Sequence, residues 1–359
     1  MALKGNKGEW SEIYTLFKLL GDTQVYAGDG NLNKIPTIFY PIIKVLRTEK
    51  IGDFEYEIIN NTIRISGKGK QIDVPTVDFA KQAARLLSEI KQSKDTTFSL
   101  PAVENFMTQV SCSTLKAKSS DKTDIKIVIH DHTTGINPTL GFSIKSRLGS
   151  PSTLLNPGAG TNFIYKITGF NPEQNQIDEI NNISGGSKLV DRIKKIEEQG
   201  GKLTYHAMQS DVFENNLTLI DSQLPEIIAE AISLFFTKRV SKLKDIVAEL
   251  ETNNPLNYNT NNKHKFYDYK LKHFLTDVAL GMTPTKVWNG KYDANGGYLI
   301  VKENGDVLCY HIYNKNDFED YLINHTKLET ASSGRYNFGK LEKKGSELYF
   351  KLNLQIRFL

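Results

Sequence analysis

The chain has 359 residues, of which 24% are charged and 39% apolar, and its formal net charge at pH 7 is +4. This length suffices for one elaborated domain or two, and the composition is that of an ordinary globular protein. No run of about 18 apolar residues is present, so we expect no membrane-spanning helix. Cys112 and Cys309 form no Cys-x-x-Cys pair, which argues against a zinc ribbon or a disulfide framework.

The N-terminal stretch also lacks the apolar segment of a secretion signal, so a reducing cell interior is expected. A first helix is predicted over residues 5–20, because apolar residues recur there at helical spacing. Glu9 lies near the apolar face of this helix by angular position, and Glu12 lies one turn further on. A carboxylate turned towards a core is costly unless it meets a cation or a metal. The alternative is that Glu9 lies in the first turn simply because a negative charge there opposes the helix dipole.

The following elements alternate between strands and helices up to residue 250. Loops and short strands are predicted over residues 22–66, and long helical pieces, interrupted near Pro225, over residues 212–250. Further helices are predicted at residues 75–92, 101–110 and 189–198, and further strands at 161–167 and 202–207. We therefore predict an α/β core over residues 1–252.

An asparagine-rich stretch, residues 253–262, is the most linker-like part of the chain. Beyond it the pattern predicts a helix at 264–281, a hairpin with Asn304 and Gly305 at its turn, and a short helix at 317–324. One alternating strand is predicted from residue 348 to the end. Residues 253–359 are thus interpreted as an α+β region, either separate or packed into the same domain.

The stretch most suggestive of chemistry is a predicted hairpin from Asp124 to Lys145, in which T-D-I-K-I-V-I-H-D and L-G-F-S-I-K-S flank a turn. Antiparallel pairing would bring Asp124 and Lys145 to the same end of the sheet, and Ser143 shares a face with Lys145. Metal-dependent phosphodiester hydrolysis needs a carboxylate, further oxygen ligands and a nearby cation. The hairpin supplies the carboxylate and the cation, and the carbonyl of Ile144 is a further oxygen ligand if the strand is distorted there.

This spacing resembles the PD-(D/E)xK nuclease superfamily, whose signature is an acidic residue, a hairpin and then acid-x-Lys. Here Thr123 replaces the proline and Ser143 replaces the second acid, so a metal-binding carboxylate must come from elsewhere. The segment K-G-E-W-S-E resembles the K-G-x-x-x-E start of some junction resolvases in this superfamily. That resemblance selects Glu12 as the ligand, whereas the angular position selects Glu9.

Asp131, at the far end of the first strand, is an alternative to Asp124 for the acidic role, but the hairpin length favours Asp124. His130 and His132 flank Asp131 and share a face of the strand, as a pair of metal ligands would. No third ligand is visible nearby, so we interpret both histidines as polar residues close to the turn.

Longer blocks are similar to the HpaII family of type II restriction endonucleases. They are spread over essentially the whole chain and read G-N-K-G-E-W-S-E-I-Y-T-L-F-K-L-L, G-F-S-I-K-S-R-L-G-S-P-S-T-L-L-N, T-N-F-I-Y, S-S-G-R-Y-N-F-G and K-L-N-L-Q-I-R-F. The resemblance implies a Mg²⁺-dependent homodimer that cuts both strands of double-stranded DNA at a short palindrome, which is CCGG for the name-giving member. It also implies a restriction-endonuclease-like core with a central mixed β-sheet flanked by helices, a prokaryotic cytoplasmic location, and a cognate DNA methyltransferase protecting the same site.

The resemblance also implies roles for individual residues. Asp124 would bind Mg²⁺ and bridge to the scissile phosphate, Glu12 or Glu9 would complete the metal shell, and Lys145 would orient or deprotonate water or stabilise charge. The polar segment after Lys145, unless it is an ordinary surface loop, would contact phosphates through Ser146, Arg147, Ser152, Thr153 and Asn156. A G·C-rich site calls for Arg or Lys against guanine and acceptors against cytosine, and the candidates are Arg335, Asn337, Gln355 and Arg357.

Two alternatives stay open at this point. A structure-specific repair or resolvase-type nuclease would keep Asp124 and Lys145 but lack site-specific double-strand cutting. A non-catalytic DNA-binding relative is the other alternative, because Ser143 stands where the second acid is expected. The region 253–359 is expected to serve DNA recognition or dimerisation, and dimerisation follows from the twofold symmetry of a palindromic target.

Overall fold

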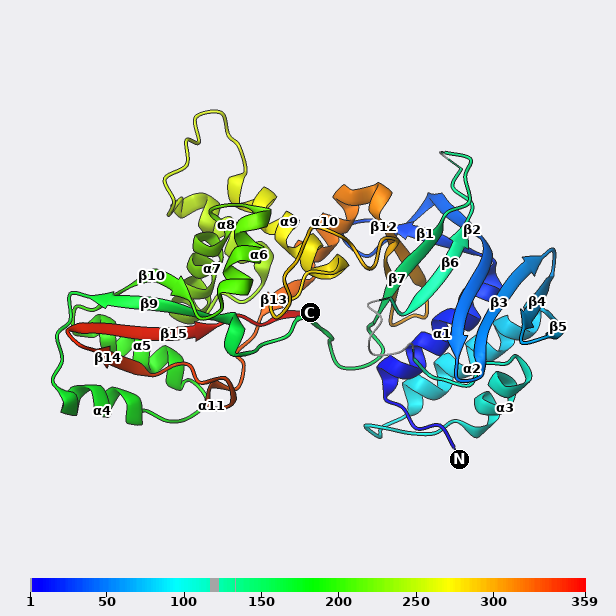
Figure 1. Cartoon of the computed structure of the whole chain (residues 1–359), viewed down its shortest axis with the longest axis horizontal. Coiled ribbons are helices and arrows are strands. Elements are labelled where there is room, and N and C mark those ends of the chain that lie inside the picture. Colours follow the sequence, from blue (N-terminus) through cyan, green and yellow to red (C-terminus); the bar gives the residue numbers. More distant parts are fainter. Residues whose placement is uncertain (1, 117–122, 133) are drawn as a thin grey trace. The chain divides into compact units, whose positions relative to one another are not determined.

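The computed structural model describes residues 2–116, 123–132 and 134–359, and the chain divides into two compact units (Figure 1). Unit 1 joins Met1–Ser152 to Tyr292–Tyr321, and unit 2 joins Thr153–Lys291 to Leu322–Leu359. The boundary placed after residue 252 on sequence grounds lies within unit 2, where the asparagine-rich stretch connects α8 (Leu243–Asn253) to α9 (Phe266–Leu280). No helix among the described residues is long and apolar enough to cross a membrane.

Unit 1 is built on a nine-stranded mixed sheet in the order β1-β12-β11-β7-β6-β2-β3-β4-β5. Because β1 pairs with both β12 and β2, six of these strands close into a barrel-like ring, from which β3, β4 and β5 extend. The pairs β1–β12 and β7–β11 are parallel and the others are antiparallel. The strands are β1 (Gln24–Gly28), β2 (Lys34–Glu49), β3 (Gly52–Ile59), β4 (Thr62–Gly67), β5 (Lys70–Pro75), β6 (Ile125–Ile129), β7 (Thr139–Ser146), β11 (Gly297–Val301) and β12 (Val307–His311). The predicted mixed sheet is confirmed, and its closure into a ring is an additional feature.

The prediction of only loops and short strands over residues 22–66 is wrong for β2, which is 16 residues long. Its first part pairs with β1 and its second part with β6 and β3, with an irregularity between Ile42 and Lys44. Proline is uncommon inside strands because it lacks an N–H, but the carbonyl of Pro41 still accepts a hydrogen bond from His130 N at 2.8 Å. The strand therefore continues through the proline and connects two parts of the sheet.

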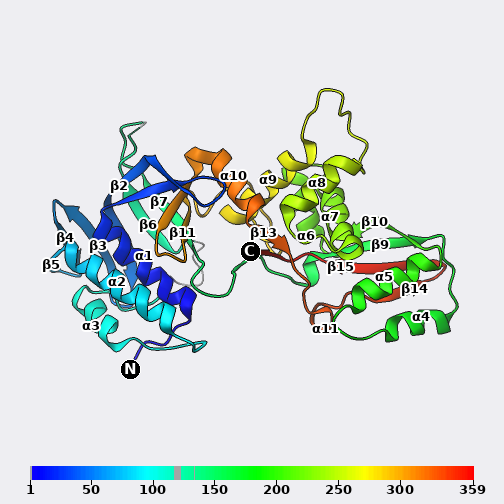
Figure 2. The ribbon, with the colours of Figure 1, turned by 180° about the vertical axis from the view of Figure 1, so that it is seen from behind.

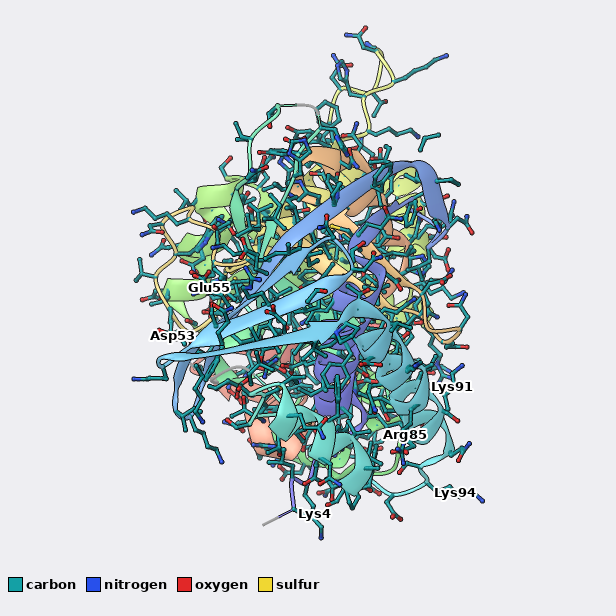
Figure 3. The ribbon with its side chains drawn as sticks, turned by 90° about the vertical axis from the view of Figure 1, so that its right-hand side faces the viewer. Lys4, Asp53, Glu55, Arg85, Lys91 and Lys94 are labelled. Atoms are coloured by element: carbon teal, nitrogen blue, oxygen red, sulfur yellow. The ribbon has the colours of Figure 1, made fainter. Side chains whose placement is uncertain are left out.

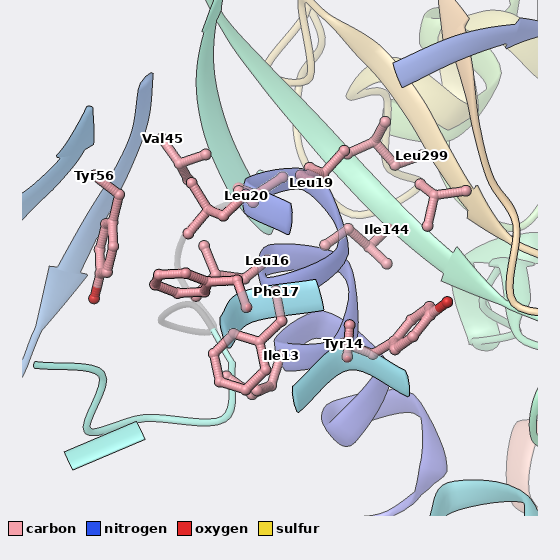
Figure 4. Close-up of a cluster of buried hydrophobic side chains, with 14 of the residues drawn as sticks. Ile13, Tyr14, Leu16, Phe17, Leu19, Leu20, Val45, Tyr56, Ile144 and Leu299 are labelled. Carbon is pink, nitrogen blue, oxygen red and sulfur yellow. The ribbon is translucent and has the colours of Figure 1, made fainter. Parts of the chain in front are cut away.

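Helix α1 (Lys7–Asp22) lies beside α2 (Thr76–Gln92) in unit 1 (Figure 2) and contacts β7, β1 and β2. Because α1 packs against these elements on more than one side, its Leu16, Phe17 and Leu20 are fully buried. Figure 4 shows these side chains with Val45 of β2 and Ile144 of β7 in one apolar cluster. A hydrogen bond between Ser11 of α1 and Ser146 of β7 places the N-terminal half of α1 near the end of β7. Helix α3 (Pro101–Gln109) completes the predicted helices of this unit.

Unit 2 contains a four-stranded antiparallel sheet, β10-β9-β15-β14, and a three-stranded sheet, β13-β16-β8. Helix α7 contacts both β10 and α5, and α4 contacts β14. The helices are α4 (Gln174–Asn182), α5 (Lys188–Glu198), α6 (Asp211–Ile220), α7 (Leu224–Lys238), α8, α9 and α11 (Ser333–Tyr336), and α10 (Lys315–Asn324) crosses the boundary between the units. The strands are β8 (Thr153–Leu155), β9 (Asn162–Thr168), β10 (Lys202–Met208), β13 (Thr326–Leu328), β14 (Leu341–Lys344), β15 (Glu347–Asn353) and β16 (Ile356–Phe358).

The single strand predicted from residue 348 to the end is wrong, because the chain changes sheets within it. β15 pairs with β9 and β14, whereas β16 pairs with β13 and β8. Between them the main-chain N–H of Leu354 donates to Thr161 O at 3.0 Å. The alternating apolar pattern continues through this change, because both strands bury alternate residues.

Candidate active site

The predicted hairpin is confirmed, with β6 and β7 as its two strands. Asp124 immediately precedes β6, and its main-chain N–H donates to Phe142 O at 2.9 Å. Ile125 is in register with Phe142 across the antiparallel pair. The side chain of Asp124 therefore lies beside the C-terminal half of β7, where Ser143 and Lys145 follow.

A chain of hydrogen bonds joins the two charged residues of the hairpin. Oδ2 of Asp124 accepts hydrogen bonds from the main-chain N–H of Ile144 at 2.6 Å and from Oγ of Ser143 at 3.1 Å. Nζ of Lys145 donates to the same Ser143 oxygen at 2.9 Å. Ser143, at the position of the missing second acid, thus links the carboxylate to the ammonium.

Lys145 is half-buried between this hydroxyl and an aromatic ring. Nζ lies 5.1 Å from the ring centroid of Tyr298 on β11. Tyr298 is in parallel register with Ser143 of β7. Burial lowers the pKa of Lys145, and the negative charges of Asp124 and Glu12 only partly oppose this shift. The sequence contains no signal for Tyr298 as a neighbour of Lys145, because parallel pairing of two strands that are distant along the chain leaves no local pattern.

The structure separates the two glutamates of α1. Oε1 of Glu9 pairs with Nζ of Lys116 at 2.7 Å, and Oε2 accepts the N–H of Asn6 at 3.0 Å, as part of a capping box. Burial alone would raise the pKa of Glu9, but these interactions outweigh it and lower the pKa. The charge of Glu12, in contrast, acts on Lys145 as well as on Lys116. Glu9 therefore caps the helix, and Glu12 is the α1 carboxylate that acts on the hairpin.

A pocket of about 320 Å³ lies next to Asp124. It is lined by the end of β2, the start of β3 and the start of β6 through Leu46, Arg47, Thr48, Asp53, Phe54, Glu55, Thr123, Asp124, Ile125 and Lys126. Figure 3 shows Asp53 and Glu55 on the β3 side of unit 1, apart from the basic Lys4, Arg85, Lys91 and Lys94. The hairpin carboxylate thus lies at a concave surface of the same unit, which also carries the charged residues Arg47, Asp53, Glu55 and Lys126.

Asp131, the alternative acid, lies at the opposite end of β6 and is buried. Its Oδ2 accepts a hydrogen bond from Thr134 Oγ1 at 2.6 Å, which holds the turn. The rings of His130 and His132 meet edge to face with centroids 4.8 Å apart, and His130 Nδ1 lies 2.9 Å from Asn137 Oδ1. Within the described ranges no three His, Cys, Asp or Glu side chains are grouped to hold a metal. This end of the hairpin therefore has the character of a structured turn.

Comparison with known proteins extends these observations to the whole chain. The model of the family described as HpaII restriction endonuclease matches residues 6–358. The chain is 50% identical over 358 residues to the type II restriction enzyme HpaII of Haemophilus parainfluenzae. The aligned region covers 99% of this chain and 98% of that protein. The chain belongs to the HpaII restriction endonuclease family. No solved structure matches it.

In this member of the HpaII family, the polar segment after Lys145 is divided between the two units. Oγ of Ser146 accepts a hydrogen bond from Oγ of Ser11 in α1 at 2.8 Å, and the main-chain N–H of Arg147 donates to Val301 O at 2.9 Å. The remaining three predicted phosphate contacts lie at and beyond the unit boundary. Ser152 ends the first segment of unit 1, Thr153 begins β8 and Asn156 is exposed in unit 2.

The four candidates for base recognition are in two different environments within unit 2. Gln355 Nε2 and Arg357 Nη1 both donate to Oε2 of Glu329, at 3.3 and 2.9 Å. Arg335 in α11 and Asn337, which follows it, are exposed. The structure thus assigns an intramolecular partner to one pair and leaves the other pair at the surface.

Proposed function

We propose that this HpaII family member is a Mg²⁺-dependent type II restriction endonuclease of the PD-(D/E)xK superfamily, which hydrolyses both strands of double-stranded DNA at a short palindrome. The observation that carries the proposal is the hydrogen-bonded chain from Asp124 through Ser143 to Lys145. The negative charge of Glu12, on α1, acts on Lys145 as well. This arrangement supplies a carboxylate, a cation and a second carboxylate at one end of a hairpin.

The oxygen atoms at this end suit Mg²⁺, which prefers hard oxygen ligands and retains several waters. Among the described residues, both hydrogen bonds to the Asp124 carboxylate go to Oδ2, so Oδ1 is available. The N–H and C=O of a strand residue point to the same side, so the Ile144 carbonyl faces the same side as its N–H, which bonds Asp124. Glu12 would supply the second carboxylate, which Ser143 cannot. A bound Mg²⁺ would neutralise negative charge at the scissile phosphate.

Each residue of this hydrogen-bonded chain then has a separate task. Asp124 anchors the oxygen ligand set, and the hydroxyl of Ser143 fixes the position of the Lys145 amine. Lys145 stands where an ammonium can orient the attacking water and stabilise the charge that develops on the phosphate. Its half-buried position strengthens this electrostatic effect, because the local dielectric constant is lower than in water. Glu9 is the helix-capping residue in this scheme.

The restriction-endonuclease assignment carries further consequences. A twofold-symmetric target calls for two active sites related by the same symmetry, so we infer a homodimer. CCGG, the site that the family resemblance implies, is the first target to test. A cognate DNA methyltransferase would protect that site in the host without having to contact the nuclease.

Digestion of a sequenced, unmethylated plasmid with Mg²⁺, followed by mapping of the fragment ends, tests the proposal. Discrete fragments whose ends share one palindrome are expected, and the same reaction with EDTA or with Asp124→Ala should leave the plasmid intact. A plasmid without CCGG is the specificity control. Nicking confined to branched DNA would favour a resolvase-type nuclease, and intact DNA in every reaction would favour a non-catalytic binder.

A further inference from the structure

The segment 332–339, which we call the recognition loop, has an exposed tip on a buried base. Arg335 and Asn337 are exposed, whereas Phe338 and Gly339 are buried. Asn337 has a φ of 50°, in the left-handed region that asparagine tolerates better than most residues. The loop therefore presents two polar side chains from a defined backbone conformation.

One anchor of this loop is Arg192 of α5, whose side chain is buried. Its Nη1 donates to the carbonyl of Gly339, and its Nη2 donates to the carbonyls of Asn181 and Ile183. Burying a guanidinium costs free energy that hydrogen bonds must offset, and these acceptors are all main-chain carbonyls. Arg192 thus ties the end of the loop to the end of α4.

The second anchor is Asn162, at the start of β9, which is also buried. Its Nδ2 donates to Tyr336 O at 2.9 Å and to Gln209 Oε1 at 2.9 Å, and its Oδ1 accepts from Asn353 Nδ2 at 2.7 Å. Both ends of the buried Asn162 amide thus have partners, which favours one conformation, while Oδ1 of Asn353 has none among the described residues. Tyr336 O and Gly339 O, on either side of Asn337, are therefore both held from within unit 2.

The tip itself offers hydrogen-bond donors to a ligand. Within the described part of the chain, Arg335 makes no ion pair, and its guanidinium carbon lies 5.4 Å from the ring centroid of Tyr336. A guanidinium that rests on an aromatic ring keeps its donor fork oriented. Such a fork matches the O6 and N7 acceptors of guanine in the major groove, and an asparagine amide matches adenine or, through its oxygen, cytosine N4.

We propose that the recognition loop determines DNA specificity, with Arg335 reading a guanine, Asn337 contacting a neighbouring base, and Arg192 and Asn162 acting as positioning residues. This inference rests on the proposed nuclease function. A loop held in one conformation binds its target without a further ordering cost. It also cannot adapt to a wrong base, whose edge leaves the donors of Arg335 unpaired. Discrimination by one such bidentate contact is expected to be about 10- to 100-fold.

The test compares cleavage of a cognate duplex with cleavage of duplexes that carry single base-pair substitutions. For Arg335→Ala we expect a loss of discrimination at one base pair of each half-site and little change at the others. For Arg192→Lys, which keeps the charge but loses the fork, we expect weaker discrimination at that same base pair, with a raised KM and a largely unchanged kcat. Lys340→Ala, an exposed cation just outside the loop, is the matched control and should behave as the wild type.

Duplex binding without Mg²⁺ and the melting temperature are measured in parallel for every variant. If the wild type cuts at one site and Arg335→Ala keeps full discrimination at every base pair, the loop assignment is wrong although the nuclease function stands. If the wild type cuts no DNA, the proposed function fails, and binding then decides the loop assignment. Site-selective binding that Arg335→Ala abolishes would support it, and binding that is unselective or unaffected would overturn it.

Discussion

Nζ of Lys145 donates a hydrogen bond to Oγ of Ser143 at 2.9 Å, and the same oxygen donates to Asp124 at 3.1 Å. A hydroxyl can serve both neighbours at once because it carries one donor and two acceptor lone pairs. At the position where the PD-(D/E)xK signature has a metal-binding acid, this chain therefore has Ser143, whose hydroxyl bonds both Asp124 and Lys145. The second carboxylate would have to come from α1.

Asp124→Ala and Lys145→Ala should each slow cleavage by at least about 100-fold, the scale of losing one electrostatic contact to the transition state. Binding of the duplex should largely persist, because DNA affinity comes mainly from many phosphate contacts. Single-turnover cleavage and fluorescence polarisation measure the two effects separately. Full activity in either variant would show that the catalytic residues lie elsewhere.

Ser143→Ala should lower kcat by about 10-fold or more, because the Lys145 amine loses its fixed acceptor while the charged groups remain. Ser143→Asp places a second carboxylate beside Asp124, where like charges repel unless a cation lies between them. We therefore expect Mg²⁺ to raise the melting temperature of Ser143→Asp more than that of the wild type. Equal Mg²⁺ responses and an unchanged kcat in Ser143→Ala would remove Ser143 from the site.

Glu9→Gln and Glu12→Gln should have opposite effects. Glu9→Gln should lower the free energy of unfolding at pH 7 by about 1 kcal/mol, the usual scale of a helix cap, with cleavage retained. Folding lowers the pKa of Glu9. The contribution of ionised Glu9 to the free energy of unfolding is therefore present above the unfolded-state pKa and is lost as the pH falls through the folded-state pKa. Urea unfolding at pH 7 and pH 3 measures this difference.

Glu12→Gln should leave stability nearly unchanged and abolish Mg²⁺-dependent cleavage, because it removes the proposed second carboxylate. The informative measurement is the cleavage rate as a function of Mg²⁺ concentration in both variants. If Glu9→Gln fails to cut while Glu12→Gln cuts normally, the choice of α1 ligand is reversed.

The pH dependence of cleavage should reveal the charge state of Lys145. Burial lowers its pKa below the usual 10.5, so the ammonium required for charge stabilisation is lost at a lower pH than for an exposed lysine. Relative to Lys145→Arg, which stays charged, wild-type activity should decline as the pH rises towards 10.5. A wild-type advantage that instead grows with pH would assign Lys145 the role of general base.

His311 in β12 predicts a pH dependence of stability that is independent of catalysis. Its side chain is fully buried, and burial lowers its pKa to about 4, although Asp131 opposes the shift. The stability that depends on neutral His311 is complete above the unfolded-state pKa of about 6.5 and is lost as the pH falls towards 4. Between pH 7.5 and pH 5, the free energy of unfolding of the wild type should fall by roughly 1–2 kcal/mol more than that of His311→Phe. Equal declines would show that His311 does not control this transition.

The sequence predicted the elements whose signal is local. The hairpin that brings Asp124 beside the end of β7 was predicted because two alternating runs flank a short turn, and this pairing depends on neighbouring residues. Most helices were found from apolar periodicity for the same reason. For residues 212–250 the sequence predicted one interruption of the helical pattern, near Pro225. The structure has a second one at Arg239, where the chain turns with a φ of 58°.

The elements that the sequence did not predict depend on contacts between distant segments. Closure of the sheet requires β1 to pair with both β2 and β12, and the aromatic neighbour of Lys145 comes from β11. The strand predicted over residues 348–358 divides because its two halves find different partners. No periodicity within one segment encodes which other segment it meets, because pairing is decided by the joint burial of both.

The sequence by itself determined that a carboxylate and a lysine stand at one end of a hairpin, and that the chain resembles the HpaII family from end to end. Only the tertiary structure decided how the remaining polar groups are used. Glu9 is occupied by Asn6 and Lys116, while Glu12 acts on Lys145. Both glutamates carry the same charge, one helical turn apart. They differ because folding pairs the Glu9 carboxylate with Asn6 and Lys116, whereas the charge of Glu12 also reaches Lys145 of the hairpin.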